Sequence, residues 1–362
     1  MTGAGTAGRA AVAAARGVTR HLSFAPMMDH TDRHCRFVLR QLTRETLLYT
    51  EMINANALVL GRRVDLLTFA PEEHPLALQL GGDDPTTLAA AARIAVDLGY
   101  DEINFNVGCP SDRVQKGRFG ACLMAEPERV ADIVAATRAA VDVPVTVKHR
   151  IGIDARDSYE ELLAFVDTVA RAGCDRFTVH ARKAWLHGLS PKENRTVPPL
   201  RYGEVHRLKR ERPGLAIEIN GGFVSRKAVL GQLGLVDGVM VGRAALDDPW
   251  MWSRADSEIF GGPSDPLADR VAFVAALVPY LHGITGAGLK LHLVLRHVLG
   301  LFRGTPGSRR WKHGVAELAR RSDAAAIGEL LSLARGLSES AESAESAESG
   351  GREAPACEHP GS

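Results

Sequence analysis

The chain has 362 residues, of which 45% are hydrophobic and 24% charged, and its formal net charge is +1 at pH 7. This composition is typical of a soluble globular protein with more chain than one ordinary domain of about 150 residues needs. No uncharged apolar run is long enough for a transmembrane helix, so we expect no membrane association. The five cysteines are widely spaced without a C-x-x-C pair, so we expect no disulfide framework, no metal site and a reducing, cytoplasmic location.

The two ends of the chain differ in composition from its middle. Residues 1–20 are rich in Ala, Gly and Arg and lack a long apolar stretch, so we expect a flexible extension and not a secretory signal. Residues 337–362 contain Ser-Ala-Glu repeats and have a net charge of −5, and we expect them to form a disordered acidic tail. The rest of the chain therefore carries +6, which is compatible with a nucleic-acid partner and also with ordinary solubility.

Between these ends, short apolar runs alternate with helical patterns. Eight runs are predicted strands, at residues 22–26, 47–50, 76–80, 102–106, 143–148, 176–180, 216–220 and 238–242. Helices that open with Pro or Ser are predicted between them, at 85–98, 127–140, 158–172 and 225–233. This alternation predicts an α/β fold, a (β/α)8 TIM barrel over residues 21–262, with a doubly wound open sheet as the alternative.

The strand signals stop after about residue 264. Helical patterns follow at residues 269–281, 288–301 and 315–333. We therefore predict a C-terminal helical domain over residues 263–336.

Polar residues recur at or just after the ends of the predicted strands. The carboxyl ends of parallel strands form the active-site face of a TIM barrel, so this recurrence predicts a site at the barrel mouth. The polar positions are Asp29, Gln79, Asn104, Asn106, Lys148, His180 and Asn220, and the apolar pair Met27 and Met28 directly precedes Asp29.

Glycines follow the last two predicted strands, in Asn220-Gly221-Gly222 and in Gly242-Arg243. TIM barrels commonly bind phosphate at these two loops, because glycine lets the backbone approach an anion closely. Together the two motifs indicate a phosphorylated cofactor, although these residues do not distinguish a flavin from another phosphorylated group.

A thiol follows the fourth predicted strand, in Gly108-Cys109-Pro110. Its flanking Gly and Pro place Cys109 on a loop and not in a core strand. A thiol at a barrel mouth can donate a proton or act as a nucleophile, so we favour a catalytic role for Cys109 over inert packing.

In this order the motifs resemble those of the tRNA-dihydrouridine synthases, flavin enzymes that reduce uridines in tRNA. The resemblance extends over residues 21–335 and is greatest to the A-type bacterial subfamily. The motifs that carry it are Ala25-Pro26-Met27-Met28-Asp29-His30-Thr31-Asp32, Gln79-Leu80-Gly81-Gly82, Asn104-Phe105-Asn106-Val107-Gly108-Cys109-Pro110-Ser111, Val147-Lys148-His149-Arg150, His180-Ala181-Arg182-Lys183-Ala184-Trp185, Gly188-Leu189-Ser190-Pro191-Lys192-Glu193-Asn194-Arg195 and Asn220-Gly221-Gly222.

The resemblance implies an FMN-dependent enzyme that reduces the C5–C6 bond of uridines in the tRNA D-loop, at positions 20 and 20a, with NADPH as reductant. It implies that FMN N5 delivers a hydride to C6 and that Cys109 protonates C5. It implies that FMN is held by Pro26, Met27, Met28, Gln79, Lys148, His180, Asn220, Gly221, Gly222, Gly242 and Arg243. It implies that tRNA is contacted by Asn106, Lys192, Arg195, Arg309 and Lys312. We expect a monomer without bound metal.

Two other function classes remain open. One is an FMN barrel oxidoreductase for a free small molecule, such as a dihydropyrimidine- or dihydroorotate-type dehydrogenase, which has no need of two basic sets of residues or a helical appendage. The other is an RNA-binding protein without chemistry, which has no need of a thiol beside Gln79, Lys148 and His180.

Overall fold

The computed structural model describes residues 20–321 and 323–350, with side chains described as far as residue 340. The expected extension 1–20 and the end of the expected tail, 351–362, lie almost entirely outside the described residues. The chain divides into two compact units. The first runs to Leu246 and includes Met251–Pro266, and the second comprises Asp247–Trp250 and the chain from Leu267.

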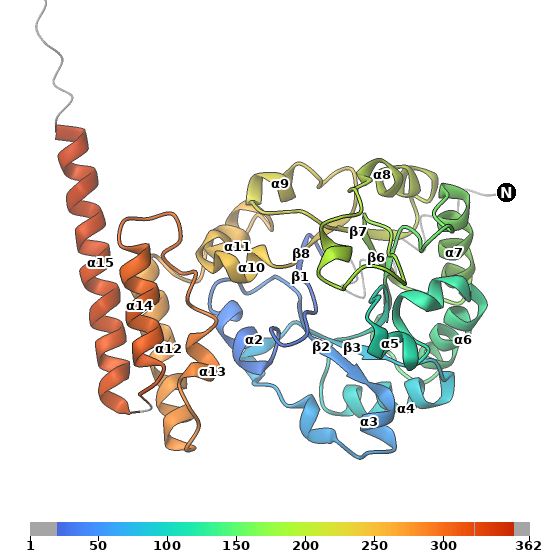
Figure 1. Cartoon of the computed structure of the whole chain (residues 1–362), viewed down its shortest axis with the longest axis horizontal. Helices are drawn as coiled ribbons and strands as arrows, with labels where there is room; N and C mark the ends of the chain where they lie inside the picture. Colours follow the sequence, from blue (N-terminus) through green and yellow to red (C-terminus); the bar gives the residue numbers. More distant parts are fainter. Residues whose placement is uncertain (1–19, 322, 351–362) are drawn as a thin grey trace, which may run out of the picture. The chain divides into compact units, whose positions relative to one another are not determined.

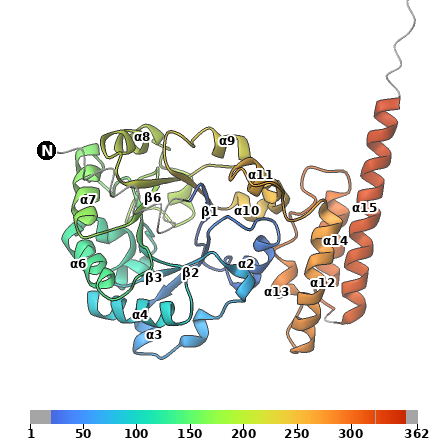
Figure 2. The same ribbon diagram turned by 180° about the vertical axis from the view of Figure 1, so that it is seen from behind.

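The first unit is a barrel of parallel strands, with helices between them (Figures 1 and 2). The strand order is β1-β8-β7-β6-β5-β4-β3-β2, and Phe24 N donates to Leu47 O at 3.0 Å, which joins β1 to the entry of β2. The strands are β1 (Leu22–Phe24), β2 (Leu48–Asn54), β3 (Leu76–Gly81), β4 (Glu102–Val107), β5 (Val145–Arg150), β6 (Arg176–His180), β7 (Ala216–Asn220) and β8 (Gly238–Val241). The predicted (β/α)8 barrel is confirmed, and the open-sheet alternative is wrong.

Several helices of this unit begin where the sequence supplies an N-cap or a proline. Asp84 accepts from Thr87 N at the start of α4, and Ser158 forms a capping box with Glu161 at the start of α7. The helices are α2 (Arg33–Arg40), α3 (Ala55–Val59), α4 (Pro85–Asp97), α5 (Asp112–Lys116), α6 (Pro127–Arg138), α7 (Tyr159–Arg171), α8 (Tyr202–Glu211), α9 (Arg226–Leu230), α10 (Ala244–Asp247) and α11 (Ala255–Glu258). Short 3-10 turns lie at η1 (Val64–Leu67), η2 (Pro71–Glu73), η3 (Gly120–Ala125), η4 (Glu193–Arg195) and η5 (Pro249–Arg254).

Alternate residues of each strand face opposite sides, and the two sides differ in polarity. On β4, Ile103, Phe105 and Val107 are buried apolar residues, whereas Glu102 and Asn104 take part in side-chain hydrogen bonds across the barrel. The same alternation recurs on β5, β6 and β7. The barrel interior is therefore largely polar, and most of the apolar packing lies outside it.

The second unit is helical. Its helices are α12 (Arg270–Gly286), α13 (His292–Leu295), α14 (Ser308–Leu318) and α15 (Ala324–Gly350), and α15 packs against both α12 and α14. Trp311 on α14 is fully buried, and its Nε1 donates to Val298 O at 2.8 Å. This indole anchors the unit's core.

Two predicted helices of this unit, and the beginning of the predicted disordered tail, differ from the structure. Residues 288–301 form only the short α13 and turns, and the pattern at 315–333 is interrupted between α14 and α15, where Asp323 Oδ1 caps Ala326 N at 2.8 Å. Residues 337–350 belong to α15 and are not disordered as predicted. Their Ala and Glu are good helix formers that continue an already nucleated helix, which the composition argument did not consider.

Candidate active site

The carboxyl ends of β4 to β7 bring four of the predicted residues into adjacent positions. Asn106 pairs in register with Lys148, and His180 pairs with Asn220. Lys148 Nζ lies 3.2 Å from Asn220 Oδ1, and Asn220 Nδ2 donates to Met240 O at 2.8 Å. The site predicted at the barrel mouth is therefore a cluster of polar side chains on neighbouring strands.

The loop after β4 holds Cys109 half-buried at this mouth. Asn106 Oδ1 accepts hydrogen bonds from Gly108 N at 3.1 Å and from Cys109 N at 2.9 Å. Gly120 has φ +79°, and a Cβ there would lie 2.5 Å from Cys109 O, so glycine is needed for the approach of the following loop. Cys109 Sγ lies 3.6 Å from Ser111 Oγ. The loop geometry fixes the thiol close to the end of β4.

Positive charge dominates the electrostatics of this region. Burial lowers the pKa of His180 well below its ordinary value, and Arg150 and Lys148 lower it further, so the imidazole is neutral near pH 7. Burial also lowers the pKa of Lys148 to about 8, with Arg150 contributing. Neutral His180 can accept or donate one hydrogen bond, and the surrounding cations favour an anionic ligand.

The glycines after β7 pack closely against the site. Gly221 has φ +121°, and a Cβ there would lie 2.9 Å from His180 Cδ2. Gly222 has φ +78°, and a Cβ there would lie 2.9 Å from the Tyr202 hydroxyl, which itself donates to Gly221 O. At the end of β8, a Cβ on Gly242 would meet no atom within 4 Å, so this turn borders open space.

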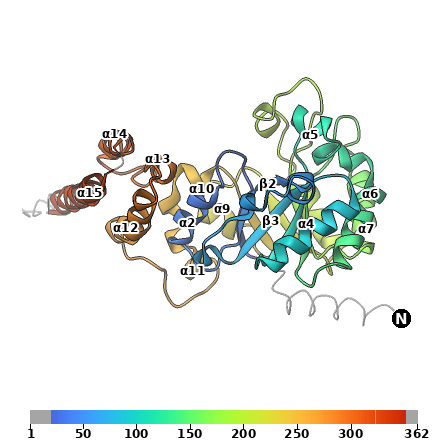
Figure 3. The same ribbon diagram turned by 90° about the horizontal axis from the view of Figure 1, so that it is seen from below.

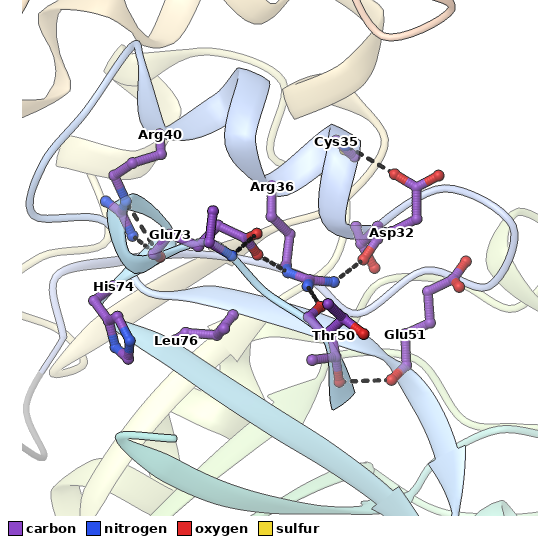
Figure 4. Close-up of polar contacts among 12 residues, drawn as sticks. Asp32, Cys35, Arg36, Arg40, Thr50, Glu51, Glu73, His74 and Leu76 are labelled. Atoms are coloured by element: carbon purple, nitrogen blue, oxygen red, sulfur yellow. Dashed lines mark hydrogen bonds and ion pairs between the residues drawn. The ribbon is translucent and has the colours of Figure 1, made fainter. Parts of the chain in front are cut away.

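The loop after β1 carries Pro26, Met27 and Met28, and Met28 is 51% exposed. The buried guanidinium group of Arg36 on α2 holds the end of this loop (Figure 4). Arg36 NH1 donates to Thr31 O at 2.9 Å, and Arg36 Nε donates to Glu73 at 2.6 Å. Both partners of this ion pair are almost fully buried, so Arg36 is held in one position. Its bond to Thr31 O then fixes the main chain that follows Met27 and Met28.

The segment after β6 lies at the same end of the barrel as α5 (Figure 3). Gln115 on α5 connects the two, since its Nε2 donates to Leu186 O at 2.7 Å. Asn194 is fully buried, and its side chain bonds both the N–H and the carbonyl of Trp185. Arg150 NH1 donates to Asn194 O at 2.8 Å. This basic loop is therefore fixed to the barrel mouth.

The four predicted tRNA-contacting cations occupy different environments. Lys192 and Arg195 are both exposed on the loop after β6. Loss of hydration lowers the pKa of Arg195 and repulsion from Arg243 lowers it further, with Cys109 acting in the opposite direction. Arg309 and Lys312 are exposed on α14 of the second unit.

The side chain of Gln79 is 1% exposed, and its amide group is hydrogen-bonded to two asparagines. Its Nε2 donates to Asn104 Oδ1 and its Oε1 accepts from Asn106 Nδ2, each at 2.8 Å.

Arg150 was not among the site residues predicted from the sequence, although it contacts the Cys109 loop. Its Nε donates to Gly108 O at 3.1 Å, and burial lowers its pKa to about 10. A second group of residues that was not predicted from the sequence lies deeper in the barrel, where Glu102, Arg176 and Glu218 are buried together. The polar-apolar alternation along β5 marks Arg150 in the sequence, and the same alternation along β4, β6 and β7 marks Glu102, Arg176 and Glu218.

Two negative findings apply to the described part of the chain. None of its helices is long and apolar enough to cross a membrane. Within the same residues, no group of three or more His, Cys, Asp or Glu side chains is arranged to hold a metal ion.

Comparison with known proteins agrees on one family. The profile of the dihydrouridine synthase (Dus) family matches residues 23–335. A tRNA-dihydrouridine(20/20a) synthase of Synechocystis sp. is 57% identical over 296 residues, which cover 82% of this chain and 88% of that protein. The proteins of the same name from Escherichia coli K12 and Shewanella oneidensis are 54% and 52% identical, over 83% and 85% of this chain and 87% and 92% of theirs.

A solved structure shares the fold. The 2-naphthoyl-CoA reductase complex with 2-naphthoyl-CoA superposes with a TM-score of 0.50 at 11% identity, over 67% of this chain and 50% of that one. With the family match over most of the length, these similarities identify the chain as an oxidoreductase that belongs to the dihydrouridine synthase family.

Proposed function

We propose that this chain reduces the C5–C6 double bond of uridines in the tRNA D-loop, at positions 20 and 20a, with FMN as cofactor and NADPH as reductant. The observation that carries the proposal is Cys109 held at a barrel mouth rich in cations, next to Asn106. The names of relatives that are more than half identical support the substrate and the two positions.

The residues at the mouth fit a flavin mononucleotide. A phosphate group needs backbone N–H groups and a cation, which the segment from Asn220 to Gly222, the open turn at Gly242 and Arg243 can supply. The ring and ribityl chain need polar donors with an apolar seat, for which Lys148, His180 and the Pro26–Met28 loop are suited. Gln79 retains one amide hydrogen and one lone pair beyond its bonds to the asparagines.

The chemistry divides between the cofactor and the chain. When bound, FMN would supply the hydride that adds to uracil C6, and NADPH would reduce the flavin again. Cys109 donates its Sγ proton to C5, so one hydride and one proton complete the reduction of the double bond. The thiolate left on Cys109 is then stabilised by the positive charges of Lys148, Arg150 and Arg195, which interact electrostatically with this thiol.

The substrate must also be brought to the mouth. A uracil within a folded D-loop cannot reach a barrel interior unless the nucleotide is extruded. Extrusion requires the protein to hold the neighbouring phosphates, which we assign to Lys192 and Arg195 on the loop after β6, and to Arg309 and Lys312 on α14. Asn106, at the end of β4, faces the extruded base in this proposal.

The role of Cys109 can be tested with a matched cysteine. Cys109→Ala should keep FMN and tRNA binding but lower the single-turnover rate of dihydrouridine formation by roughly 10²- to 10⁴-fold, the usual contribution of a proton donor. Cys122 is another half-buried thiol, on η3, and its Sγ donates to Phe119 O. Cys122→Ala should retain the wild-type rate. A wild-type rate in Cys109→Ala would remove this thiol from the mechanism.

A further inference from the structure

A continuous series of side-chain hydrogen bonds descends from the Cys109 loop into the barrel. Asn106 Nδ2 donates to Gln79 Oε1, and Gln79 Nε2 donates to Asn104 Oδ1, each at 2.8 Å. Asn104 Nδ2 then donates to Thr146 Oγ1 at 2.9 Å, and Thr146 Oγ1 donates to a carboxylate, Glu102 Oε1, at 2.7 Å. Four hydrogen bonds between five strand residues thus link the mouth to the base of the barrel.

The lower end of the series is an ion pair. Arg176 NH2 lies 2.6 Å from Glu102 Oε1, and the Tyr49 hydroxyl donates to the same oxygen at 3.1 Å. Burial alone would lower the pKa of Arg176, but Glu102 and other neighbours raise it well above its ordinary value. Glu102, Arg176 and Tyr49 are at most 2% exposed. Arg176, Tyr49 and Thr146 all donate to Glu102 Oε1, so this oxygen acts as the acceptor at the lower end of the series.

The acceptor role of Glu102 Oε1 sets the direction of the hydrogen bonds from Thr146 up to Gln79. The single proton of the Thr146 hydroxyl has Glu102 Oε1 as its nearer acceptor, at 2.7 Å, and Ile103 O at 3.4 Å, and the hydroxyl oxygen accepts from Asn104. The Asn104 amide is thereby oriented with its oxygen towards Gln79. The Gln79 amide then has its nitrogen towards Asn104 and its oxygen towards Asn106. At the top, Asn106 must present its Oδ1 to the N–H groups of Gly108 and Cys109.

We propose that Asn104 and Thr146 are positioning residues for the reduction, which set the amide orientation of Gln79 and Asn106 and so hold the Cys109 loop in place. Asn104 and Thr146 are fully buried and lie below the mouth, so they act through the residues above them. This inference rests on the proposed function of Cys109 and Gln79. It extends that function to residues that touch neither base nor cofactor.

Thr146→Val tests the inference, because valine keeps the shape of threonine but neither donates nor accepts. The Asn104 amide then loses the partner that orients it. Hydrogen exchange at the amides of Gly108 and Cys109, followed by mass spectrometry on the full chain, should accelerate by about tenfold, as expected for loss of one hydrogen bond's stabilisation. The affinity for FMN, measured by flavin fluorescence, and the single-turnover rate should fall together.

Two controls separate orientation from general destabilisation. Thr146→Ser keeps the hydroxyl and should restore wild-type exchange at Gly108 and Cys109. Thr178→Val removes an equivalent buried bond, since Thr178 Oγ1 donates to Glu218 on the neighbouring strand. Glu218 lies 4.0 Å from Arg176, but Thr178 itself is not a member of the series. It should cost similar stability to urea but leave exchange at Gly108 and Cys109 within about twofold of the wild type.

The possible outcomes are distinct. Unchanged exchange in Thr146→Val, or equal acceleration in Thr178→Val, would overturn the inference. If Thr146→Val does not fold, Asn104→Ala replaces it, because water in the space it leaves can satisfy Gln79 but cannot impose a direction. Failure of the proposed function would appear differently, as wild-type protein that does not reduce tRNA while its exchange pattern still responds to Thr146→Val.

Discussion

The half-buried charge of Lys148 predicts a pH-dependent stability. Burial at the barrel mouth lowers the pKa of this amine from 10.5 to about 8. One pKa unit corresponds to about 1.36 kcal/mol, so keeping Lys148 charged in the folded protein costs roughly 3 kcal/mol. Lys148→Met keeps most of the side chain and removes the charge, so the variant should be more stable than the wild type at pH 7 by up to this amount.

The sign of the pH dependence follows from proton binding. Below pH 8 the amine is protonated in both states and the full cost applies. Between pH 8 and 10.5 the folded protein has released the proton that the unfolded chain still binds. The free energy of unfolding of the wild type should therefore rise by about 1.4 kcal/mol per pH unit relative to Lys148→Met. Above pH 10.5 the cost has gone.

Urea unfolding of both proteins without added cofactor, between pH 7 and 9.5, measures this difference. The advantage of the variant should shrink by about 2 kcal/mol over that range. Lys192→Met, at an exposed position, controls for the loss of one lysine and should show no such trend. A difference that stays constant with pH, or a variant less stable than the wild type at pH 7, would refute the reasoning.

Three further predictions concern single contacts. Glu73→Gln leaves the buried Arg36 without its carboxylate and should lower the free energy of unfolding by about 3–5 kcal/mol in urea titrations. Gly221→Ala forces alanine to φ +121° against its neighbours and should weaken FMN binding in fluorescence titrations, whereas Gly203→Ala, on α8 with nothing within 4 Å, should not. Lys192→Ala should reduce the slope of log affinity for tRNA against log salt by about 1, and an unchanged slope would exclude a phosphate contact.

The strands and the position of the mouth were predictable because both depend on local pattern. Each predicted run overlaps an observed strand, since a parallel strand in a barrel reads as a short apolar segment between helices. The ends of those runs place Asn106, Lys148, His180 and Asn220 at one edge without any knowledge of contacts. Chain order and strand direction suffice for that step.

The interior of the barrel was not predictable in the same way. Glu102, Arg176 and Glu218 lie on three different strands, and only the register of the closed barrel brings their charges together. The environment of Arg195 likewise depends on the path of a long loop that Asn194 fixes from within. Such residues look like surface charges or turn residues in a single sequence.

The helical part shows a different limit. The apolar pattern at 315–333 continues across the turn between α14 and α15, because both helices contribute apolar residues to one core. A hydrophobic period does not by itself locate a reversal of chain direction. The cap at Asp323 is the local signal that does.

The most direct test of the proposed function is anaerobic mixing of the NADPH-reduced protein with unmodified tRNA and, separately, with free uracil. The flavin absorbance reports reoxidation, and mass spectrometry of the digested tRNA reports dihydrouridine at positions 20 and 20a. Fast reoxidation by tRNA alone, with dihydrouridine at those positions, is the predicted result. Preferential reoxidation by free uracil, or a protein that does not take up FMN, would contradict it.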